Sequence, residues 1–397
     1  MSADNKIPEN ENINNSTDAA ELPSAEENPS VAEIEASDTG ATEDKKIKNK
    51  KKDKKKKNKA VKIILRILLI ILIVILVLAL SAGIAVAVLY NKGKSSLKNE
   101  SINITAPPEL KEEVTKIDNG AEVYYNGGQY KFNENIVTFL LMGVDKRDID
   151  DQKVPGSNGQ ADALFLVVAD TESGDVDFIN ISRDAMTNVS IYSSAGSYIR
   201  DERMQACLAY AYGKDQESSC QNVIKSVSEL MYGIPINSFF SMDLKAIGVL
   251  NDSVGGVEVP EYNEDFSALT GKKVTLWGKE AENYVRLRDK KVLDSNVDRM
   301  ERQKTYIKAF VDKAVMLTKE DITTPVTLFQ ALDGYKYSDI TVDEITYMAI
   351  NFLDGISNME MHSIEGTVVK GEKYAEFEVD PIALYEMILD IFYVKIN

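Results

Sequence analysis

The sequence is poor in the residue types that build most metal and disulfide sites. Its 397 residues include one histidine, His362, and two cysteines, Cys207 and Cys220. A single histidine excludes histidine-based zinc sites and catalytic devices that need two histidines. Two cysteines exclude a thiolate metal cluster and a disulfide-dense scaffold, and they form either one disulfide or two buried free thiols. The chemistry must therefore come from carboxylates, arginines, lysines, hydroxyls or a hard metal ion.

Positive charge is also in short supply. The formal net charge is -17, with 46 lysines and arginines against 63 acidic residues. Nucleic-acid binders carry a basic footprint, so we expect no nucleic acid as a partner. Hydrophobic residues make up 44% of the chain, which is enough to bury a sizeable core and excludes global disorder.

Large hydrophobic residues are almost absent from residues 1–42. Such a stretch cannot bury enough apolar surface to offset the conformational entropy that it would lose on folding. From Lys45 to Lys62 the chain holds twelve lysines and one acid, Asp53. We therefore predict that residues 1–62 form a disordered tail, acidic at first and then rich in lysine.

A long apolar segment follows this tail. Ile67–Leu89 is a run of 23 residues without a charge, and at about 1.5 Å per residue it is long enough to cross a bilayer. Ala85-Val86-Ala87 resembles a signal-peptide cleavage site, but the preceding segment and the apolar run are both longer than in signal peptides. We predict an uncleaved signal-anchor helix over residues 63–90.

The lysines on the N-terminal side of this helix predict its orientation. By the positive-inside rule the tail is cytoplasmic, and the chain is a single-pass protein of the cell membrane. Residues 91–133 are expected to be an extracytoplasmic linker or stalk, and residues 134–397 a folded domain. Tyr124, Tyr125 and Tyr130 lie before that domain, in a hairpin packed on it or in a stalk element.

The arginines are concentrated in one part of the chain. Residues 91–397 carry a net charge of -18, so an anionic ligand needs a local basic cluster there. Arginine offers a planar fork for carboxylate or phosphate, and its concentration indicates oxyanion recognition, although structural ion pairs with acids are the alternative. Eight of the nine arginines lie in this stretch: Arg147, Arg183, Arg200, Arg203, Arg286, Arg288, Arg299 and Arg302.

Hydrophobic patterning from Glu134 onward alternates between strands and helices. Strands are predicted at 136–144, 163–169 and 175–181, because these are short apolar runs bounded by turn residues. Helical periodicity marks 218–231, 244–254, 279–288, 297–316, 341–354 and 381–392. We infer an α/β fold, a mixed central β-sheet with helices on both faces. Ligands of open sheets bind beyond the strand ends, where Asp145, Asp162 and Arg183 are expected to converge.

The segment 286–303 forms a second group of candidate residues. Arg299, Arg302 and Gln303 are spaced i, i+3 and i+4, so they share one face of a helix start. Free backbone N–H groups of a first turn suit an anion, while the alternative is a solvated, charged helix start.

An ordered set of short motifs then resembles one known family, the LytR–CpsA–Psr cell-wall glycopolymer transferases, over about residues 134–395. The motifs are Leu-Met-Gly-Val-Asp-Lys-Arg (141–147), Ala-Asp-Ala-Leu-Phe-Leu-Val (161–167), Phe-Ile-Asn-Ile-Ser-Arg-Asp (178–184), Ala-Tyr-Ala-Tyr-Gly (209–213), Gly-Ile-Pro-Ile (233–236), Val-Gly-Gly-Val (254–257), Tyr-Val-Arg-Leu-Arg (284–288) and Asp-Arg-Met-Glu-Arg-Gln (298–303).

This resemblance implies an α-β-α domain that transfers teichoic acid or a capsular or wall polysaccharide from a polyprenyl-pyrophosphate carrier to peptidoglycan, through a phosphodiester. Asp145 and Asp162 would hold Mg²⁺, or Mn²⁺ in its place, on the pyrophosphate. The polyprenyl tail would lie in an apolar tunnel between sheet and helices. The residues implied as catalytic are Asp145, Arg183, Arg286, Arg288 and Arg299, and those implied to bind the pyrophosphate are Arg147, Arg203, Arg302 and Gln303.

Two departures from the family pattern bear on activity. Gln160-Ala161-Asp162 stands where the family has Arg-Ser-Asp, so one cation near the pyrophosphate is missing. Ser182 replaces the proline before Arg183. The alternative function is therefore a non-catalytic protein of the same fold that holds polyprenyl phosphate or wall polymer.

The resemblance leaves the general base open, with Asp145 or a metal-bound water as candidates. Ser95-Ser96-Leu97-Lys98 matches the Ser-x-x-Lys motif of serine enzymes but has no domain around it.

Overall fold

The structure is a computed structural model of the chain. It describes residues 42–97, 102–151, 154–264, 268–287, 295–371 and 374–397. The predicted disorder of residues 1–41 lies outside this part, as do Arg288 and Lys98. The chain divides into two units, residues 1–76 and 77–397.

Helix α1 (Thr42–Ser96) runs through the lysine-rich segment and the apolar segment. The prediction of a disordered tail up to residue 62 is therefore wrong for residues 42–62. Lysine is a good helix former, so the run continues the helix of the apolar segment toward the N-terminus. Within α1, Leu65–Ser96 is long and apolar enough to cross a membrane by length and composition.

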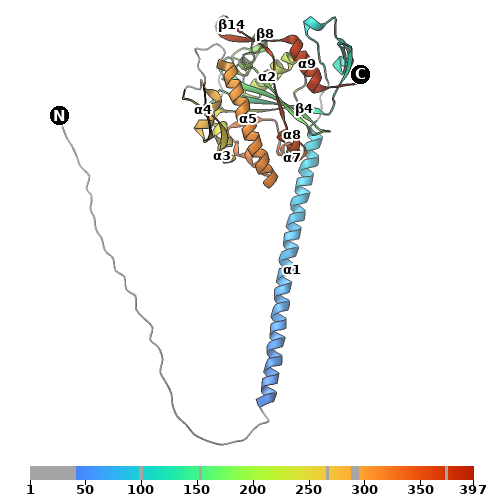
Figure 1. The fold of residues 1–397 in the computed structure, drawn as a ribbon, viewed down its shortest axis with the longest axis vertical. Helices are drawn as coiled ribbons and strands as arrows, with labels where there is room; N and C mark the ends of the chain where they lie inside the picture. Colours follow the sequence, from blue (N-terminus) through green and yellow to red (C-terminus); the bar gives the residue numbers. More distant parts are fainter. Residues whose placement is uncertain (1–41, 98–101, 152–153, 265–267, 288–294, 372–373) are drawn as a thin grey trace, which may run out of the picture. The chain divides into compact units, whose positions relative to one another are not determined.

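A mixed six-stranded sheet forms the centre of the second unit (Figure 1). The middle pair, β4 and β5, is antiparallel, and β5 is also antiparallel to β6. Strands β9 and β13 pair in parallel with β4 and β6, and β12 closes one edge antiparallel to β9. In sheet order the strands are β12 (Lys336–Ser338), β9 (Ser238–Met242), β4 (Ile136–Val144), β5 (Ala161–Asp170), β6 (Val176–Ile181) and β13 (Glu360–Ser363).

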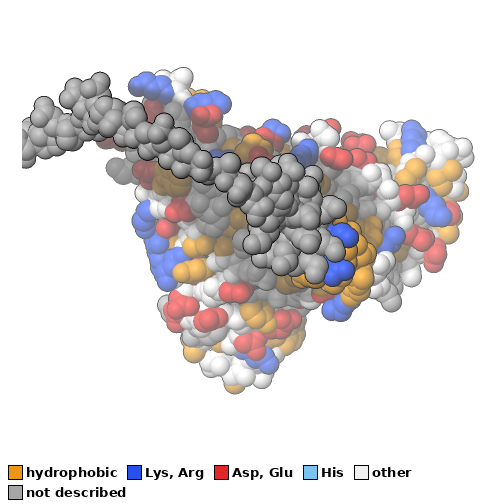
Figure 2. Space-filling view, turned by 90° about the horizontal axis from the view of Figure 1, so that it is seen from below, with side chains coloured by type: hydrophobic (Ala, Val, Ile, Leu, Met, Phe, Trp, Pro, Cys, Tyr) orange, Lys and Arg blue, Asp and Glu red, His pale blue; other side chains and the backbone are white. Residues whose placement is uncertain are grey.

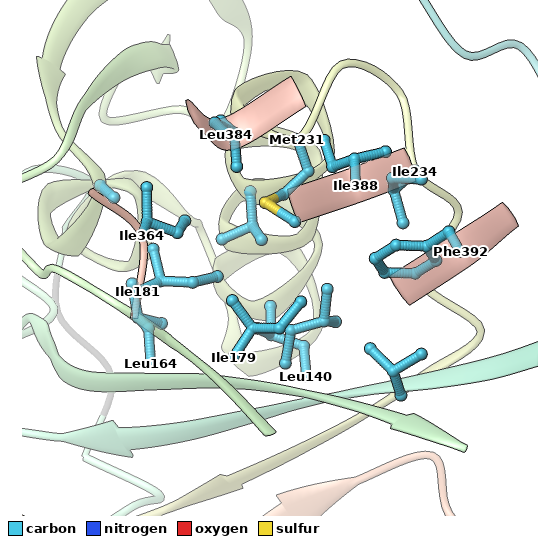
Figure 3. Packing of buried hydrophobic residues seen from close by; sticks show 14 of the residues in the cluster. Leu140, Leu164, Ile179, Ile181, Met231, Ile234, Ile364, Leu384, Ile388 and Phe392 are labelled. Carbon is cyan, nitrogen blue, oxygen red and sulfur yellow. The ribbon is translucent and has the colours of Figure 1, made fainter. Parts of the chain in front are cut away.

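Both faces of this sheet are apolar because neighbouring side chains along each strand point to opposite faces. Leu140 belongs to a cluster that packs against α2 (Gln216–Leu230) and α9 (Pro381–Phe392), as Figure 3 shows for Ile388 and Phe392. Helix α9 begins at this position because Asp380 accepts hydrogen bonds from two backbone N–H groups of its first turn and Pro381 opens the helix.

The opposite face of the sheet carries a second cluster. Phe139 on β4 and Phe178 on β6 pack there with Tyr347 and Phe352. The helices that contribute to this layer are α5 (Ser295–Glu320), α7 (Val342–Asn351) and α8 (Leu353–Ser357). A central sheet with helices on both faces is the predicted fold class, which is thereby confirmed.

A third cluster lies beside the sheet and supports the segment that carries Arg286. Tyr284 and Val285 of α4 (Lys279–Arg286) pack there with Tyr306 of α5. The other elements of this region are α3 (Leu244–Ser253), β10 (Val257–Tyr262), β11 (Leu269–Leu276) and α6 (Thr324–Ala331).

The stretch 102–132 packs on the domain and is not a free linker or stalk. Of the two interpretations of the tyrosines, the hairpin is confirmed, because β2 and β3 pair antiparallel and Tyr125 is buried in the main cluster. Strand β3 also pairs with β16, which joins the two ends of the folded unit. The strands of this sheet are β1 (Thr115–Ile117), β2 (Glu122–Tyr125), β3 (Gly128–Phe132) and β16 (Tyr393–Lys395), with one-turn 3₁₀ helices at Pro108–Leu110 and Asp118–Gly120.

The predicted elements match the structure in most places. The predicted helix over 341–354 is interrupted at Phe352, which separates α7 from α8. Helix α6 was not predicted. Neither were β9, β12 and β13 of the central sheet. Three hairpins and a 3₁₀ segment were also not predicted, which are β7 (Met186–Tyr192) with β8 (Tyr198–Gln205), β10 with β11, β14 (Gly366–Lys370) with β15 (Ala375–Val379), and Ala206–Tyr212.

Charges of both signs share the surface of the molecule. On the face shown in Figure 2, acidic and basic side chains of the described residues are interspersed. Exposed pairs such as Lys273–Glu258 and Arg200–Glu202 contribute to this mixture. An anion site on this acidic protein would therefore depend on a local cluster of basic residues.

Candidate active site

The two aspartates predicted to bind a metal ion lie at the same end of two neighbouring strands. Asp145 follows the last residue of β4, and Asp162 is the second residue of β5. Val144 pairs with Ala161, and the Asp145 N–H donates to the Gln160 carbonyl at 2.8 Å. The antiparallel pairing of these strands thus places both carboxylates at one edge of the sheet.

Arg183 joins this edge from the third strand. It lies two residues after the end of β6, and its guanidinium donates to the Asp162 carboxylate. It also donates to the side-chain oxygen of Gln160 and, at 3.2 Å, to the sulfur of Cys207. Gln160 stands where the family that the sequence resembles has arginine, and here its side chain accepts a hydrogen bond from Arg183.

The electrostatics of Arg183 keep it charged. Burial alone lowers its pKa, but Cys207, Asp162 and Asp184 outweigh burial and raise the pKa of Arg183 above its ordinary value. Burial also raises the pKa of the Cys207 thiol to about 12, so the thiol is neutral at physiological pH. The carboxylates of Asp162 and Asp184 are consequently the anions that stabilise the Arg183 cation.

Arg299 approaches the same carboxylate from a helix. It lies in the first turns of α5, its side chain is 5% exposed, and its Nη1 is 3.6 Å from the second oxygen of Asp162. Asp162 is thus shared by Arg183 and Arg299, one on each carboxylate oxygen.

A second group surrounds Asp145. Arg286, the last residue of α4, places Nη2 at 2.9 Å from Asp145 and Nη1 at 2.8 Å from Glu282. Arg147 makes two hydrogen bonds to the same Glu282 carboxylate, at 2.9 and 2.8 Å. Glu282 therefore joins Arg147 to Arg286, and Arg286 in turn contacts Asp145.

Glu282 is a residue that the sequence analysis missed. Its side chain is 5% exposed, and burial alone raises its pKa. Arg147, Lys279 and Arg286 outweigh burial and hold the pKa of Glu282 below its ordinary value. The spacing from Glu282 to Arg286 is i, i+4, which places the two side chains together on one face of a helix and could have pointed to the pair.

Arg302 and Gln303 donate hydrogen bonds to backbone carbonyls near the end of α4. The buried Arg302 guanidinium donates to the backbone carbonyls of Tyr284 and Leu287 and lies 5.5 Å from the ring centre of Tyr262. Gln303 donates to the carbonyl of Val285 at 3.1 Å. Both side chains hold the C-terminal end of α4, which carries Arg286, against α5. Their contact with pyrophosphate stays a prediction.

Arg203 is also outside this network. It lies on β8, where its guanidinium donates to the carbonyl of Met186 and to Glu378 of β15. Its neighbours are therefore those of the hairpins. Arg288 lies outside the described residues.

We define the arginine–carboxylate centre as the residues that the structure joins at the strand ends, which are Asp145, Arg147, Asp162, Arg183, Glu282, Arg286 and Arg299.

An apolar cavity of about 110 Å³ adjoins this centre. Its lining includes Ser182 and Asp184, which flank Arg183, and Met300, which follows Arg299. Its apolar wall consists of Met300, Ile364, Val368, Ala375 and Phe377. Three carboxylate residues, Asp184, Glu301 and Glu376, also line it, whereas Arg183 and Arg299 are only chain neighbours of lining residues.

The donor chemistry of the two strand-end aspartates fits a hard divalent ion. Carboxylate oxygens are the protein ligands that Mg²⁺ and Mn²⁺ prefer. The side chain of Asp145 is 47% exposed and that of Asp162 is 23% exposed, so both can be approached by an ion that keeps water or phosphate ligands. Both carboxylates pair with arginines here, and a phosphate group is the anion that those arginines would accept in exchange.

The two cysteines are free and buried. Of the two alternatives from the sequence, buried free thiols are confirmed and a disulfide is not formed. Cys220 lies in the main core cluster, and Cys207 contacts the centre through Arg183.

Comparison with known proteins gives a family match over most of the chain. Residues 94–387 match the model of the LytR_cpsA_psr family. Residues 22–156 also match the model of a chordopoxvirus protein family, which covers mainly the tail and α1 and stops before Asp162.

Curated relatives share low sequence identity with the chain. A polyisoprenyl-teichoic acid–peptidoglycan teichoic acid transferase TagU of Enterococcus faecalis is 22% identical over 240 residues, 59% of this chain and 72% of the relative. The protein of the same name from Bacillus cereus is 25% identical over 235 residues, 58% of this chain and 69% of the relative.

Solved structures support the fold. The crystal structure of TagV from B. subtilis has a TM-score of 0.51 at 20% identity and covers 64% of this chain and 95% of its own. Protein gbs0355 from Streptococcus agalactiae has a TM-score of 0.52 at 18% identity, with coverage of 65% and 86%. These similarities show a shared architecture.

Proposed function

Because the chain belongs to the LytR–CpsA–Psr family, we propose that it is a membrane-anchored phosphotransferase that attaches a glycopolymer to peptidoglycan. The polymer is teichoic acid or a capsular or wall polysaccharide, and its carrier is polyprenyl pyrophosphate. The names of the relatives support the transfer of teichoic acid to peptidoglycan.

One observation carries this proposal, which is that arginines from three separate segments meet carboxylate oxygens at the strand ends. Arg183 and Arg299 share Asp162, and Arg286 pairs with Asp145. A planar guanidinium binds carboxylate and phosphate in the same way, so these contacts support the proposal that the same arginines bind a pyrophosphate.

The reaction follows from that arrangement. A muramyl hydroxyl oxygen attacks the phosphorus that bears the glycan, the P–O bond to the second phosphate breaks, and the carrier leaves as polyprenyl phosphate. Arg183, Arg286 and Arg299 offset the charge that develops on the phosphate oxygens. Asp145 accepts the hydroxyl proton in this scheme, because its carboxylate is the more exposed of the two.

Asp145 and Asp162 would hold Mg²⁺ or Mn²⁺, which when bound neutralises negative charge on the pyrophosphate oxygens. Arg147 acts through Glu282, which aligns Arg286. The apolar cavity beside Arg183 is proposed to take the first isoprene units of the carrier, since its Met300, Ile364 and Phe377 wall is apolar.

The lysine run before the apolar part of α1 gives the proposed orientation. Lysines and arginines near a membrane helix remain on the cytoplasmic side, so the N-terminus is cytoplasmic and the folded unit extracytoplasmic. This location puts the centre on the side where peptidoglycan is found.

The test uses the full chain in detergent micelles, with a polyprenyl-pyrophosphate saccharide, Mg²⁺ and a peptidoglycan oligomer. Mass spectrometry follows polyprenyl phosphate and the glycan–peptidoglycan phosphodiester. Formation of both products only with the oligomer and the metal supports the transferase. Arg200→Ala is the control, because Arg200 pairs with Glu202 on the surface hairpin outside the centre.

The second candidate is a non-catalytic protein that holds polyprenyl phosphate or wall polymer. Gln160 favours it, because an uncharged acceptor stands beside Arg183 where the resembling family has a cation. Tight binding of the lipid-linked saccharide without cleavage, under conditions where a TagU relative turns it over, would contradict the transferase and support this candidate.

A further inference from the structure

The single histidine lies on the edge strand of the central sheet, which pairs with the strand that carries the motif 178–184. Strand β13 pairs in parallel with β6, so that Glu360 faces Asp177 and His362 faces Ile179. Successive side chains of a strand alternate between faces, which puts Glu360, His362 and Asp177 on one face of the sheet.

The three side chains converge on one point. One ligand atom from each of Asp177, Glu360 and His362 can be chosen so that all lie within 4.8 Å of one another. His362 Nε2 is 2.9 Å from an oxygen of Asp177. The side chains of Asp177 and His362 are 31% and 25% exposed, and Glu360 is exposed, so an ion can reach them from solvent.

The cluster contains two carboxylates and only one group that can carry a positive charge. Like charges directly opposite each other on neighbouring strands are destabilising, and Asp177 and Glu360 are such a pair. Among the residues that the structure describes, neither carboxylate forms an ion pair with a lysine or an arginine. The imidazole of His362 can share at most one positive charge with two carboxylates, so a divalent ion suits the cluster better.

We propose that Asp177, Glu360 and His362 bind one divalent first-row transition ion, such as Zn²⁺. Two carboxylate oxygens with one imidazole nitrogen form a mixed O/O/N donor set, and imidazole favours zinc and its neighbours over the hard ions Mg²⁺ and Ca²⁺. Water completes the coordination on the exposed side. The histidine count excludes a zinc site built from several imidazoles, but it does not exclude this one, in which carboxylates predominate.

The site would act on the fold rather than on the transfer reaction. An ion held by both strands cross-links the edge strand β13 to β6. Ser363 and Ile364, which follow His362 directly, line the apolar cavity beside Arg183. Metal binding therefore stabilises one wall of that cavity. The metal site does not depend on whether the chain is a transferase.

The test uses the full chain in detergent micelles, with any affinity tag removed and with histidine labelled by carbon-13 on the ring. His362 is the only histidine, so its imidazole gives a single set of resonances. Zn²⁺ and, separately, Mg²⁺ are titrated into the native protein while isothermal calorimetry measures stoichiometry and affinity. The variants are His362→Gln and Asp177→Asn, and the matched control is Glu258→Gln, an exposed strand carboxylate paired with Lys273.

We expect the His362 resonances to shift with Zn²⁺ and to saturate at one equivalent, while Mg²⁺ leaves them in place. Removal of even an outer-shell partner costs a metal site about tenfold in affinity, so His362→Gln and Asp177→Asn should lose at least that factor, and Glu258→Gln should bind like the native chain. Unmoved His362 resonances, or undiminished zinc affinity in His362→Gln, would overturn the proposal. An equal response to Mg²⁺ would overturn the choice of a transition ion.

Discussion

Arg147 and Glu282 are joined by two side-by-side hydrogen bonds of 2.9 and 2.8 Å, although they come from a strand end and a helix far apart in the sequence. The same carboxylate receives a hydrogen bond from Arg286, whose other terminal nitrogen reaches Asp145. Glu282 thus fixes the direction in which Arg286 presents its guanidinium. The alignment of this arginine depends on a residue that would not itself touch phosphate.

Glu282→Gln should weaken both folding and activity. The amide keeps the shape but removes the charge shared by two arginines, a loss on the order of 2 kcal/mol for hydrogen bonds between charged groups. Urea unfolding of the full chain measures the free energy of unfolding, and the transfer rate should fall by about tenfold or more because Arg286 is no longer aligned. Glu258→Gln, in an exposed pair, should stay within about 0.5 kcal/mol of the native protein. An unchanged unfolding midpoint in Glu282→Gln would show that the pair is dispensable.

The stabilising effect of Glu282 should depend on pH. Its pKa in the folded protein lies below its ordinary value, so its contribution is present above the unfolded pKa of about 4.3. The contribution is lost as the pH falls through the folded pKa, where the carboxylate becomes protonated. The difference in unfolding midpoint between the native chain and Glu282→Gln should therefore be constant from about pH 7 to pH 5 and shrink below about pH 4.3. A difference that does not change with pH would mean that charge is not its source.

Arg183 should be sensitive even to a conservative change. Its guanidinium contacts Asp162, Gln160 and Cys207 at once, which a lysine ammonium cannot reproduce. We expect Arg183→Lys to lower the rate constant for transfer by about a hundredfold or more, the loss typical of removing one charge-stabilising donor. Arg200→Ala should keep the native rate. Native turnover in Arg183→Lys would remove this residue from the proposed site.

Arg302 should behave as a structural residue. Its side chain is 1% exposed and its guanidinium satisfies the carbonyls at the end of α4. Arg302→Met should lower the unfolding midpoint, because the carbonyl of the buried Tyr284 loses its donor at a cost of about 1–3 kcal/mol. The carbonyl of the exposed Leu287 can bind water instead. Arg203→Met is the matched control, since Arg203 is exposed on β8. A defect in binding of the lipid-linked saccharide in Arg302→Met, without any loss of stability, would instead support the predicted contact of Arg302 with pyrophosphate.

The two thiols should be inert in the folded protein. Cys207 and Cys220 are free and buried, and burial raises the pKa of both thiols. A water-soluble aromatic disulfide reagent should detect no thiol in the native chain and two after denaturation without reductant. Detection of none after denaturation would indicate a disulfide instead.

Periodicity and strand-end chemistry predicted much of this molecule. The continuous apolar runs predicted β4, β5 and β6. The placement of Asp145 and Arg183 after two of these runs, and of Asp162 before the third, predicted that the three residues converge. Helix α9 was predicted over its observed bounds from its helical periodicity, and in the structure Asp380 and Pro381 mark its start.

The remaining parts depend on contacts that local sequence does not encode. Strand β8 is exposed over most of its length and largely polar, so it carries no hydrophobic alternation, and it pairs with the more buried β7. Arg302 and Arg299 follow the same helical spacing rules, yet one points to backbone carbonyls of α4 and the other to Asp162. Only the packing of α5 against α4 distinguishes their roles. Helix α6 is short and polar residues interrupt its apolar positions, which explains why its periodicity was missed.

The small sheet that joins β3 to β16 has a consequence for biogenesis. Tyr393 donates a hydrogen bond to the carbonyl of Gly120, a contact that spans 273 residues. The hairpin β2–β3 leaves the ribosome early, but one of its edges stays without its partner until β16 has been synthesised. High contact order of this kind slows folding, and an open strand edge is prone to wrong pairing. The protein therefore has to keep this edge from aggregating until nearly the whole folded unit has been synthesised.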